Sequence, residues 1–159
     1  MQQENKNLPD FRKFSGFGAY VEGWALYTES LGKELGLYQD PYQYFGMLSN
    51  EMHRAIRLVV DTGIHSKGWT REQAIDYSLA NEAESEASII PEIERYMAIP
   101  GQALSYKIGQ LKIIELRKKA EAKMGAKFDI KKFHEKVLES GALPLALLEK
   151  KINAWIKTE

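Results

Sequence analysis

The chain has 159 residues, with 22 Lys and Arg against 22 Asp and Glu, and 44% of its residues are hydrophobic. This length and apolar fraction predict one globular domain, residues 1–159, because about 100–200 residues is the usual size of a single core. The balanced charge argues against a nucleic-acid partner or an anionic membrane surface, because binders of both normally carry excess basic residues. Without cysteine, the chain can form neither a disulfide framework nor a thiolate zinc site. No apolar run approaches the ~20 residues needed to span a bilayer, so we expect no transmembrane segment.

Apolar residues recur at three- and four-residue spacing along most of the chain, and no stretch alternates strictly over the length of a strand. This pattern predicts an all-α fold, a compact bundle of about seven helices. We expect the first helix over about residues 17–37. The second begins after Asp40, because Pro41 fits a first helical turn, and runs to about Asp61. Gly63 and Gly68 mark the break that follows.

Local signals place the remaining five helices. Thr70 and Gln73 have the spacing of a capping box, which predicts a helix start at that point. The fourth helix must accommodate Pro91, and Asp129 is expected to cap the sixth. The expected spans are about 70–80, 84–98, 102–123 and 129–141, with a last helix from residue 144 on. The apolar pattern of the fifth helix consists of Leu104, Ile108, Leu111 and Ile114.

Two carboxylates and several small residues share one side of the first predicted helix. These residues are Gly18, Glu22, Ala25, Glu29, Gly32 and Gly36. Glycine inside a helix costs roughly 0.5–1 kcal/mol relative to alanine, so its repetition suggests that another segment packs closely on this side. Glu22 also lies among aromatic and apolar neighbours, where a buried carboxylate needs a cation, a metal or hydrogen-bond donors. The spacing alone favours a simpler interpretation, in which both carboxylates are solvated or pair with basic residues.

A second polar face follows the next helix. Glu51 and Arg54 are three residues apart, and Asp61 follows Arg54 by seven, so all three lie on one side of the helix. Arg54 can pair with Glu51, and Arg54 or Arg57 with Asp61, as on an ordinary solvated face. His65 is expected at the helix end or in the following loop, where its ring can face a cleft. There it could transfer a proton or stabilise an oxyanion, although a lone loop histidine is more often a surface residue.

A third polar face includes Tyr106 and Gly109, just after the Pro100-Gly101 turn. The phenol can donate a hydrogen bond to a developing oxyanion if this side of the helix faces a cleft. More commonly, such a tyrosine belongs to the core, with its hydroxyl hydrogen-bonded. His53 and His134 lie mid-helix beside charged neighbours, and we expect both on the surface.

Self-sufficient catalytic motifs are missing from the sequence. It contains no His-Glu-x-x-His pattern, Gly-rich phosphate loop, Gly-x-Ser-x-Gly elbow or EF-hand loop. None of the three histidines pairs with another at ligand spacing on one helix. We therefore expect no complete catalytic zinc site within this chain, because such sites use about three protein ligands and usually two or more histidines.

Five ordered motifs, together with the GALPL string near the end, resemble the C-terminal part of the bacterial family known as domain of unknown function 885 (DUF885). They are residues 20–29 (YVEGWALYTE), 36–41 (GLYQDP), 57–65 (RLVVDTGIH), 68–74 (GWTREQA) and 100–109 (PGQALSYKIG). The resemblance covers nearly the whole chain. Members of this family resemble helical zinc metallopeptidases of the gluzincin kind, and many look exported or lipid-anchored.

The resemblance implies roles for several residues. Glu22 would be the carboxylate ligand of a zinc ion, whose histidine ligands and general base come from an upstream segment with His-Glu and Pro-Gly-His motifs that this chain lacks. Glu29 and Asp61 would support the metal site through hydrogen bonds or ion pairs. His65 and Tyr106 resemble the histidine and tyrosine that stabilise the tetrahedral oxyanion in related peptidases.

A complete enzyme would use zinc as its cofactor and a peptide as its substrate. Zinc would lower the pKa of its bound water toward ~7, and the upstream glutamate would accept the proton. Arg54, Arg57 or Arg95 could anchor a carboxylate of the substrate by a bidentate contact. With one ligand in place of three, the isolated chain is expected neither to hold zinc tightly nor to hydrolyse peptides.

Two other interpretations stay open. In one, the chain is a non-catalytic helical module that docks a partner through its Gly/Glu face; in the other, it is a purely structural bundle with solvated polar faces. In the peptidase interpretation, its main partner is the upstream N-terminal half, and self-association would cover apolar surface that this half would otherwise bury. The resemblance also suggests that the parent protein is extracytoplasmic, either periplasmic or a lipoprotein.

Overall fold

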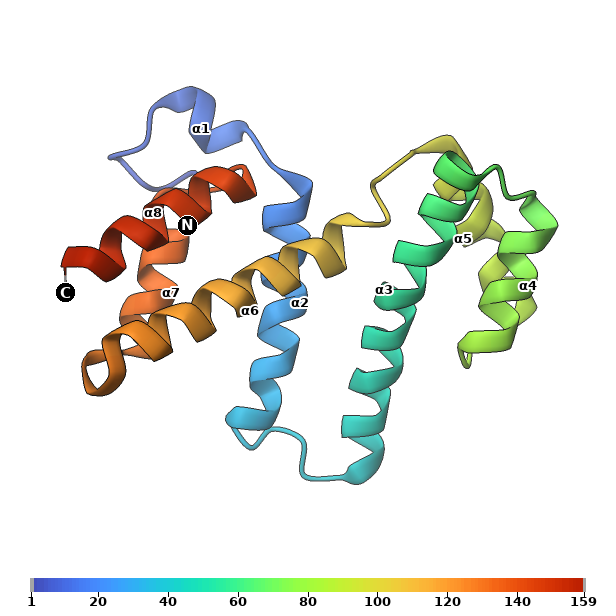
Figure 1. The fold of residues 1–159 in the computed structure, drawn as a ribbon, viewed down its shortest axis with the longest axis horizontal. Helices are drawn as coiled ribbons and strands as arrows, with labels where there is room; N and C mark the ends of the chain where they lie inside the picture. Colours follow the sequence, from blue (N-terminus) through green and yellow to red (C-terminus); the bar gives the residue numbers. More distant parts are fainter. Residues whose placement is uncertain (1, 159) are drawn as a thin grey trace. The chain divides into compact units, whose positions relative to one another are not determined.

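The computed structural model describes residues 2–158, and this part of the chain is helical without any β-strand. Eight α-helices and one short 3-10 helix are found within it (Figure 1). They are α1 (Asp10–Phe14), α2 (Gly18–Glu34), α3 (Pro41–Lys67), α4 (Arg71–Asn81), α5 (Glu86–Ala98), α6 (Ser105–Met124), η1 (Gly125–Lys127), α7 (Ile130–Leu138) and α8 (Leu145–Thr158). The prediction of an all-α fold is confirmed.

Capping side chains account for where several helices begin. The carboxylate of Asp40 accepts a hydrogen bond from the backbone N–H of Tyr42 at 2.8 Å, and Gln43 completes a capping box at the start of α3. The capping box predicted at Thr70 is present before α4. Asp129 caps α7 as predicted, through a 2.8 Å bond from the N–H of Lys131. These caps satisfy backbone donors that have no partner inside the first turn.

α3 runs to Lys67, past the end predicted at about Asp61 and past Gly63, the first of the two glycines predicted to mark the break. A Cβ atom on Gly63 would lie only 2.5 Å from the ring of Trp69, so the glycine allows the indole to pack against the helix. The helix ends at Gly68, whose φ of 71° is a left-handed conformation typical of glycine after a helix. His65 consequently lies in the last turn of α3.

The chain divides into two compact units. The first unit contains the residues up to Tyr27 together with those from Ile108 on, and the second contains Thr28–Lys107. The boundaries between them fall inside α2 and α6.

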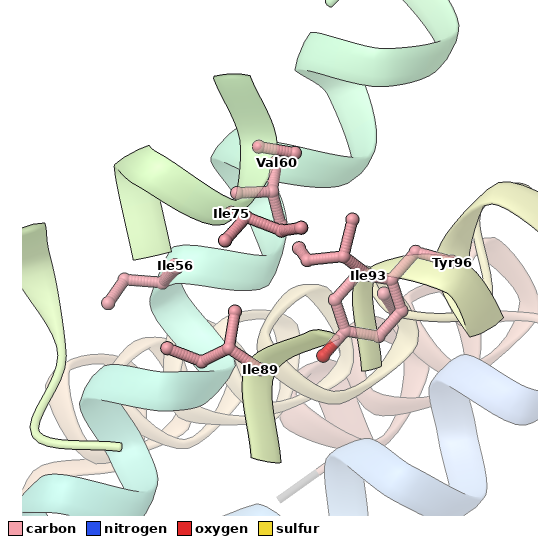
Figure 2. Packing of buried hydrophobic residues seen from close by; sticks show 8 residues of the cluster. Ile56, Val60, Ile75, Ile89, Ile93 and Tyr96 are labelled. Carbon is pink, nitrogen blue, oxygen red and sulfur yellow. The ribbon is translucent and has the colours of Figure 1, made fainter. Parts of the chain in front are cut away.

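The core of the second unit lies where α3, α4 and α5 meet. Figure 2 shows Ile56 and Val60 from α3 facing side chains of the other two helices. The buried cluster consists of Ile56, Val60, Ala74, Ile75, Ile89, Ile93, Tyr96 and Ala103. It fixes the half of α3 that also carries Arg54 and Arg57.

The core of the first unit depends on a close approach between α2 and α6. A Cβ on Gly109 would lie 2.7 Å from the Cα of Gly23 and closer still to the carbonyl oxygen of Ala19. No side chain fits there, so both positions require glycine. Around this crossing, the largest buried side chains come from α2, α6, α7 and α8: Tyr27, Ile113, Leu116, Phe133, Val137, Leu148 and Ile152.

The buried face of α6 differs from the predicted one. Ile108 and Leu111 are 46% and 48% exposed, whereas Ile113, Leu116 and Ala120 are fully buried. The contact of Gly109 with α2 explains the difference, because it turns the side of α6 that carries the glycine inward. Phe17 and Leu35, two apolar residues of the first predicted helix and its end, are also exposed at 41% and 69%.

Candidate functional site

Glu22, the predicted zinc ligand, lies on α2 in the first unit and is half-buried. Its neighbours Gly23 and Leu26 are buried, so the carboxylate lies at the border of the buried face. Its side chain makes no hydrogen bond or ion pair with any residue between 2 and 158. The predicted pairing of this carboxylate with a basic residue is therefore not found in the described part of the chain.

The residues that the structure describes do not form a complete metal centre, because no group of three or more His, Asp or Glu side chains is placed to hold an ion. The chemistry of Glu22 fits a single zinc ligand, since carboxylate oxygens bind zinc and no cation in the described chain competes for this one. Glu29 is exposed, and its backbone carbonyl accepts a 2.8 Å hydrogen bond from the hydroxyl of Tyr38.

The predicted face of small residues on α2 is not the side on which another helix packs closely. Of its small residues, only Gly32 is covered, by the ring of Tyr38 from the same unit. Gly18 and Ala25 are exposed. The closest helix contact is made by Gly23, which lies outside the predicted face.

In the second unit, Glu92 is the centre of a polar cluster. Its Oε2 accepts hydrogen bonds from Arg57 Nη2 at 2.7 Å, Arg95 Nη2 at 2.8 Å and the Tyr96 hydroxyl at 2.7 Å. Arg95 also donates from Nε to Oε1 at 3.1 Å and from Nη1 to Gln102 at 2.8 Å. The hydrogen bond from Arg95, with that from Tyr96, holds the pKa of Glu92 at about 2 against the opposing effect of burial.

His53 extends this cluster instead of lying on the surface. Its Nδ1 is bonded to the carboxylate of Glu82, and its Nε2 accepts a 3.3 Å hydrogen bond from Arg57 Nε. Because Nε2 accepts a hydrogen bond, Nδ1 is the donor in the hydrogen bond to Glu82. The Glu82 side chain is only 4% exposed, so this histidine satisfies a carboxylate that would otherwise be buried alone.

His134 also departs from the predicted surface position. Its Nε2 is 2.8 Å from the Tyr27 hydroxyl, and its ring meets Trp24 edge to face with centroids 5.4 Å apart. The histidine is half-buried in the first unit. A polar partner and two aromatic faces explain why this position holds an imidazole.

The three predicted substrate-binding arginines have different environments. Arg57 and Arg95 are both bonded to Glu92, and the Arg57 side chain is only 6% exposed. Arg54 makes no hydrogen bond or ion pair with the described residues, and its guanidinium lies over the ring of Tyr106 at 4.5 Å. Arg57 lies over the same ring at 5.1 Å. Arg54 alone of the three is available to an external anion.

His65 and Tyr106, the predicted oxyanion pair, are not in contact with each other. The ring of His65 is exposed, and its Nε2 donates a 2.9 Å hydrogen bond to the backbone carbonyl of Tyr96. Tyr106 contacts Arg54 and Arg57, which precede His65 on α3 by about 12–16 Å of helix at 1.5 Å per residue. The Tyr106 hydroxyl has no hydrogen-bond partner among residues 2–158.

The ion pairs predicted along α3 are wrong. Glu51 pairs with Lys107 at 2.6 Å instead of with Arg54. Asp61 is buried, and its carboxylate accepts the backbone N–H of Gly101 at 3.0 and 3.2 Å. Asp61 thereby anchors the turn before α6, a contact between segments 40 residues apart that helical spacing does not indicate.

Sequence reasoning missed Glu92, which binds two of the arginines, and Glu82, which binds His53. Glu92 lies three residues before Arg95 and four before Tyr96 on one helix, a spacing that can reveal such pairs. Glu82 lies in the turn between α4 and α5 and meets His53 across 29 residues, for which the sequence offers no local signal.

A small pocket of about 220 Å³ opens beside Arg54. Its lining residues are Asn50, His53, Arg54, Glu84, Ser88, Ile89 and Glu92. A larger pocket of about 470 Å³ in the first unit is mainly apolar and is lined in part by Tyr20, Trp24 and Leu138. Burial raises the pKa of Tyr20 to about 12, and its hydroxyl donates a 2.7 Å bond to the Val137 carbonyl.

The model of the family described as "Bacterial protein of unknown function (DUF885)" matches residues 1–152. A crystal structure of a putative lipoprotein from Colwellia psychrerythraea is 49% identical and has a TM-score of 0.97, covering 99% of this chain and 27% of its own. A putative lipoprotein of unknown function from Shewanella oneidensis is 30% identical with a TM-score of 0.86, covering 93% of this chain and 27% of its own. None of the curated proteins is a match.

The chain thus spans about a quarter of the length of these two similar structures. Among the helices in the described part of the chain, none has the length and apolar character required to cross a membrane.

Proposed function

Because the chain belongs to the DUF885 family of bacterial proteins, we propose that it forms the helical part of a longer zinc-dependent peptidase and supplies the carboxylate ligand of the metal. The half-buried carboxylate of Glu22, without a partner in residues 2–158, is the observation that carries the proposal. A carboxylate in this setting gains most from a cation, because partial desolvation penalises it when alone. Zinc, when bound, would polarise a peptide carbonyl and activate a water molecule.

Other residues of this chain would contact the substrate or support the metal site. Glu22 would give one oxygen to the metal, and Arg54 would bind an anionic group of the substrate. Tyr106 is better suited than His65 as a hydrogen-bond donor to the oxyanion, because its hydroxyl is not bonded to any described residue while His65 donates to the Tyr96 carbonyl. Glu29, which is exposed, and Asp61, which holds the turn at Gly101, would support the site indirectly.

The proposal is tested with a DUF885 protein that carries this segment within a chain of the full family length. Replacing Glu22→Gln removes the charged ligand and is expected to lower zinc content strongly, beyond the roughly 10–100-fold loss of affinity typical when a partner of a ligand is removed. Zinc is measured by elemental analysis after dialysis against a weak chelator. Glu115→Gln is the matched control, because Glu115 is an exposed carboxylate in the same unit that pairs with Lys112.

Both variants are checked for helix content and thermal unfolding. An equal zinc content in Glu22→Gln and the parent protein would refute the role of Glu22. It would favour the alternative function, a non-catalytic module that docks a partner, which is supported by the exposure of Gly18, Val21, Ala25 and Glu29 along α2. For the 159-residue chain alone, we expect no tight zinc binding and no peptide hydrolysis.

We also propose an extracytoplasmic location for the parent protein. The support is the likeness to two solved proteins that are described as lipoproteins. The expected partners are the remainder of the longer family chain and a peptide substrate, with self-association as a further way to cover apolar surface.

A further inference from the structure

The pocket beside Arg54 combines a cation and a carboxylate that are not neutralised by each other. Arg54, on α3, and Glu84, in the turn before α5, both line the 220 Å³ pocket. Neither makes an ion pair with any residue of the described chain. Because the two opposite charges line one small pocket and are not paired, a ligand that carries both charges can pair with each of them.

The cation is held in place by its surroundings. The guanidinium of Arg54 lies over the ring of Tyr106, and Arg57 also contacts this ring. Arg57 is itself fixed by its 2.7 Å bond to Glu92. A guanidinium stacked on an aromatic ring loses less freedom when it binds a carboxylate, so its fork of N–H donors is partly preorganised.

The start of α5 also lines the pocket. Ser88 lies in the first turn of α5, whose positive end is capped by Ser85. A helix start adds a favourable potential for a negative group, and Asn50 can donate or accept a hydrogen bond. The carboxylates of Glu84 and Glu92 oppose a multiply charged anion such as phosphate.

We propose that this pocket binds a small zwitterion of the amino-acid or dipeptide class, with the ligand carboxylate at Arg54 and the ligand ammonium at Glu84. The volume of about 220 Å³ equals the share of about seven water molecules in the liquid, which suits one or two small residues. As a substrate or product site, the pocket rests on the proposed peptidase function; as a binding site, it requires neither zinc nor catalysis.

The test measures binding of dialanine to the 159-residue chain by calorimetry and by the NMR signal of Arg54 Nε–H. N-acetyl-dialanine lacks the ammonium, dialanine amide lacks the carboxylate, and inorganic phosphate supplies an anion alone. We expect dialanine to bind at millimolar concentration and to shift the Arg54 signal. Each derivative should bind about tenfold more weakly, because it loses one charge-assisted contact.

Variants assign the two ends of the ligand. Arg54→Gln should weaken dialanine about tenfold and remove the preference for the free carboxylate. Glu84→Gln should remove the preference for the free ammonium. Arg71→Gln and Glu94→Gln are matched controls, because this exposed pair, joined at 2.6 Å, lies outside the pocket and should leave binding unchanged. Circular dichroism verifies that all four variants fold.

Equal affinity for dialanine and both derivatives would overturn the proposal, as would unchanged binding in Arg54→Gln or stronger binding of phosphate. Absence of saturable dialanine binding would overturn it too. This outcome is independent of Glu22, since the assay contains no metal. A zwitterion site can therefore stand when the zinc experiment fails, and the zinc ligand can stand when the pocket binds nothing.

Discussion

Glu92 shows how one side chain sets the roles of its neighbours. It accepts bonds from Arg57, Arg95 and Tyr96, and burial together with this carboxylate raises the pKa of the Tyr96 hydroxyl. Two of the three arginines predicted for substrate binding are consequently engaged within the chain. Glu92 thus determines which arginine remains available to an external anion, and the spacing of the arginines on α3 does not reveal this partner.

Replacing Glu92→Gln should destabilise the protein at pH 7 by about 1–2 kcal/mol, a value reduced from the full pKa difference because Glu92 is partly exposed to solvent. The pKa of Glu92 is lowered from 4.5 to about 2 in the folded protein. Its stabilising effect is therefore present above pH 4.5 and is lost as pH falls toward 2. Urea unfolding at pH 7 and at pH 3 measures the difference between the variant and the parent chain.

The stability gap between the two proteins should be smaller at the acidic pH. A gap that stays constant or widens would contradict the role assigned to the ionised carboxylate. Glu94→Gln, which removes only the exposed partner of Arg71, should cost less than about 1 kcal/mol at either pH.

At the scale of helices, the sequence predicts starts better than faces. Asp40, Thr70 and Asp129 each signal a helix start through a local interaction between neighbours in the chain, and the structure has a cap at each. The inward face of α6 depends on Gly23, which is far away in sequence. Apolar periodicity alone therefore selects Ile108 and Leu111, which are exposed.

We expect opposite effects on stability for two glycine substitutions, one at the crossing of α2 and α6 and one away from it. Gly109→Ala should destabilise the protein by about 2 kcal/mol or more, because the new Cβ would overlap the backbone of α2, which cannot rotate away. Gly46→Ala is the control: Gly46 lies inside α3 with no neighbouring atom within 4 Å. It should stabilise the protein by about 0.5–1 kcal/mol through helix propensity.

Chemical denaturation of the two variants measures both effects. A neutral or stabilising result for Gly109→Ala would show that the helices do not meet at this glycine.

At the scale of the whole molecule, each of the two units has its own buried cluster. Ile93 belongs to the cluster of α3, α4 and α5, whereas Phe133 belongs to the buried set of the first unit. Composition and length do not indicate which helices pack together, so this division into two units is visible only in the structure. We predict that each cluster gives its unit its own cooperative behaviour.

Ile93→Ala should lower the opening free energy of amides in α3, α4 and α5 by about 2–5 kcal/mol. Amides of α7 and α8 should change much less. Phe133→Ala should give the reverse pattern, with a loss of about 3–5 kcal/mol in α7 and α8. Native-state hydrogen exchange checks both, and an equal loss across all helices in either variant would indicate a single cooperative unit.

The packing of Trp69 onto Gly63 provides a spectroscopic handle on this division. Trp69 is the sole tryptophan between Thr28 and Lys107, while Trp24 and Trp155 belong to the first unit. Biosynthetic incorporation of fluorotryptophan would thus yield one resonance that reports on the environment around α3 and α4 and two that report on the other helices. Ligands of the Arg54 pocket and metal-related changes near Glu22 can then be followed separately in a single spectrum.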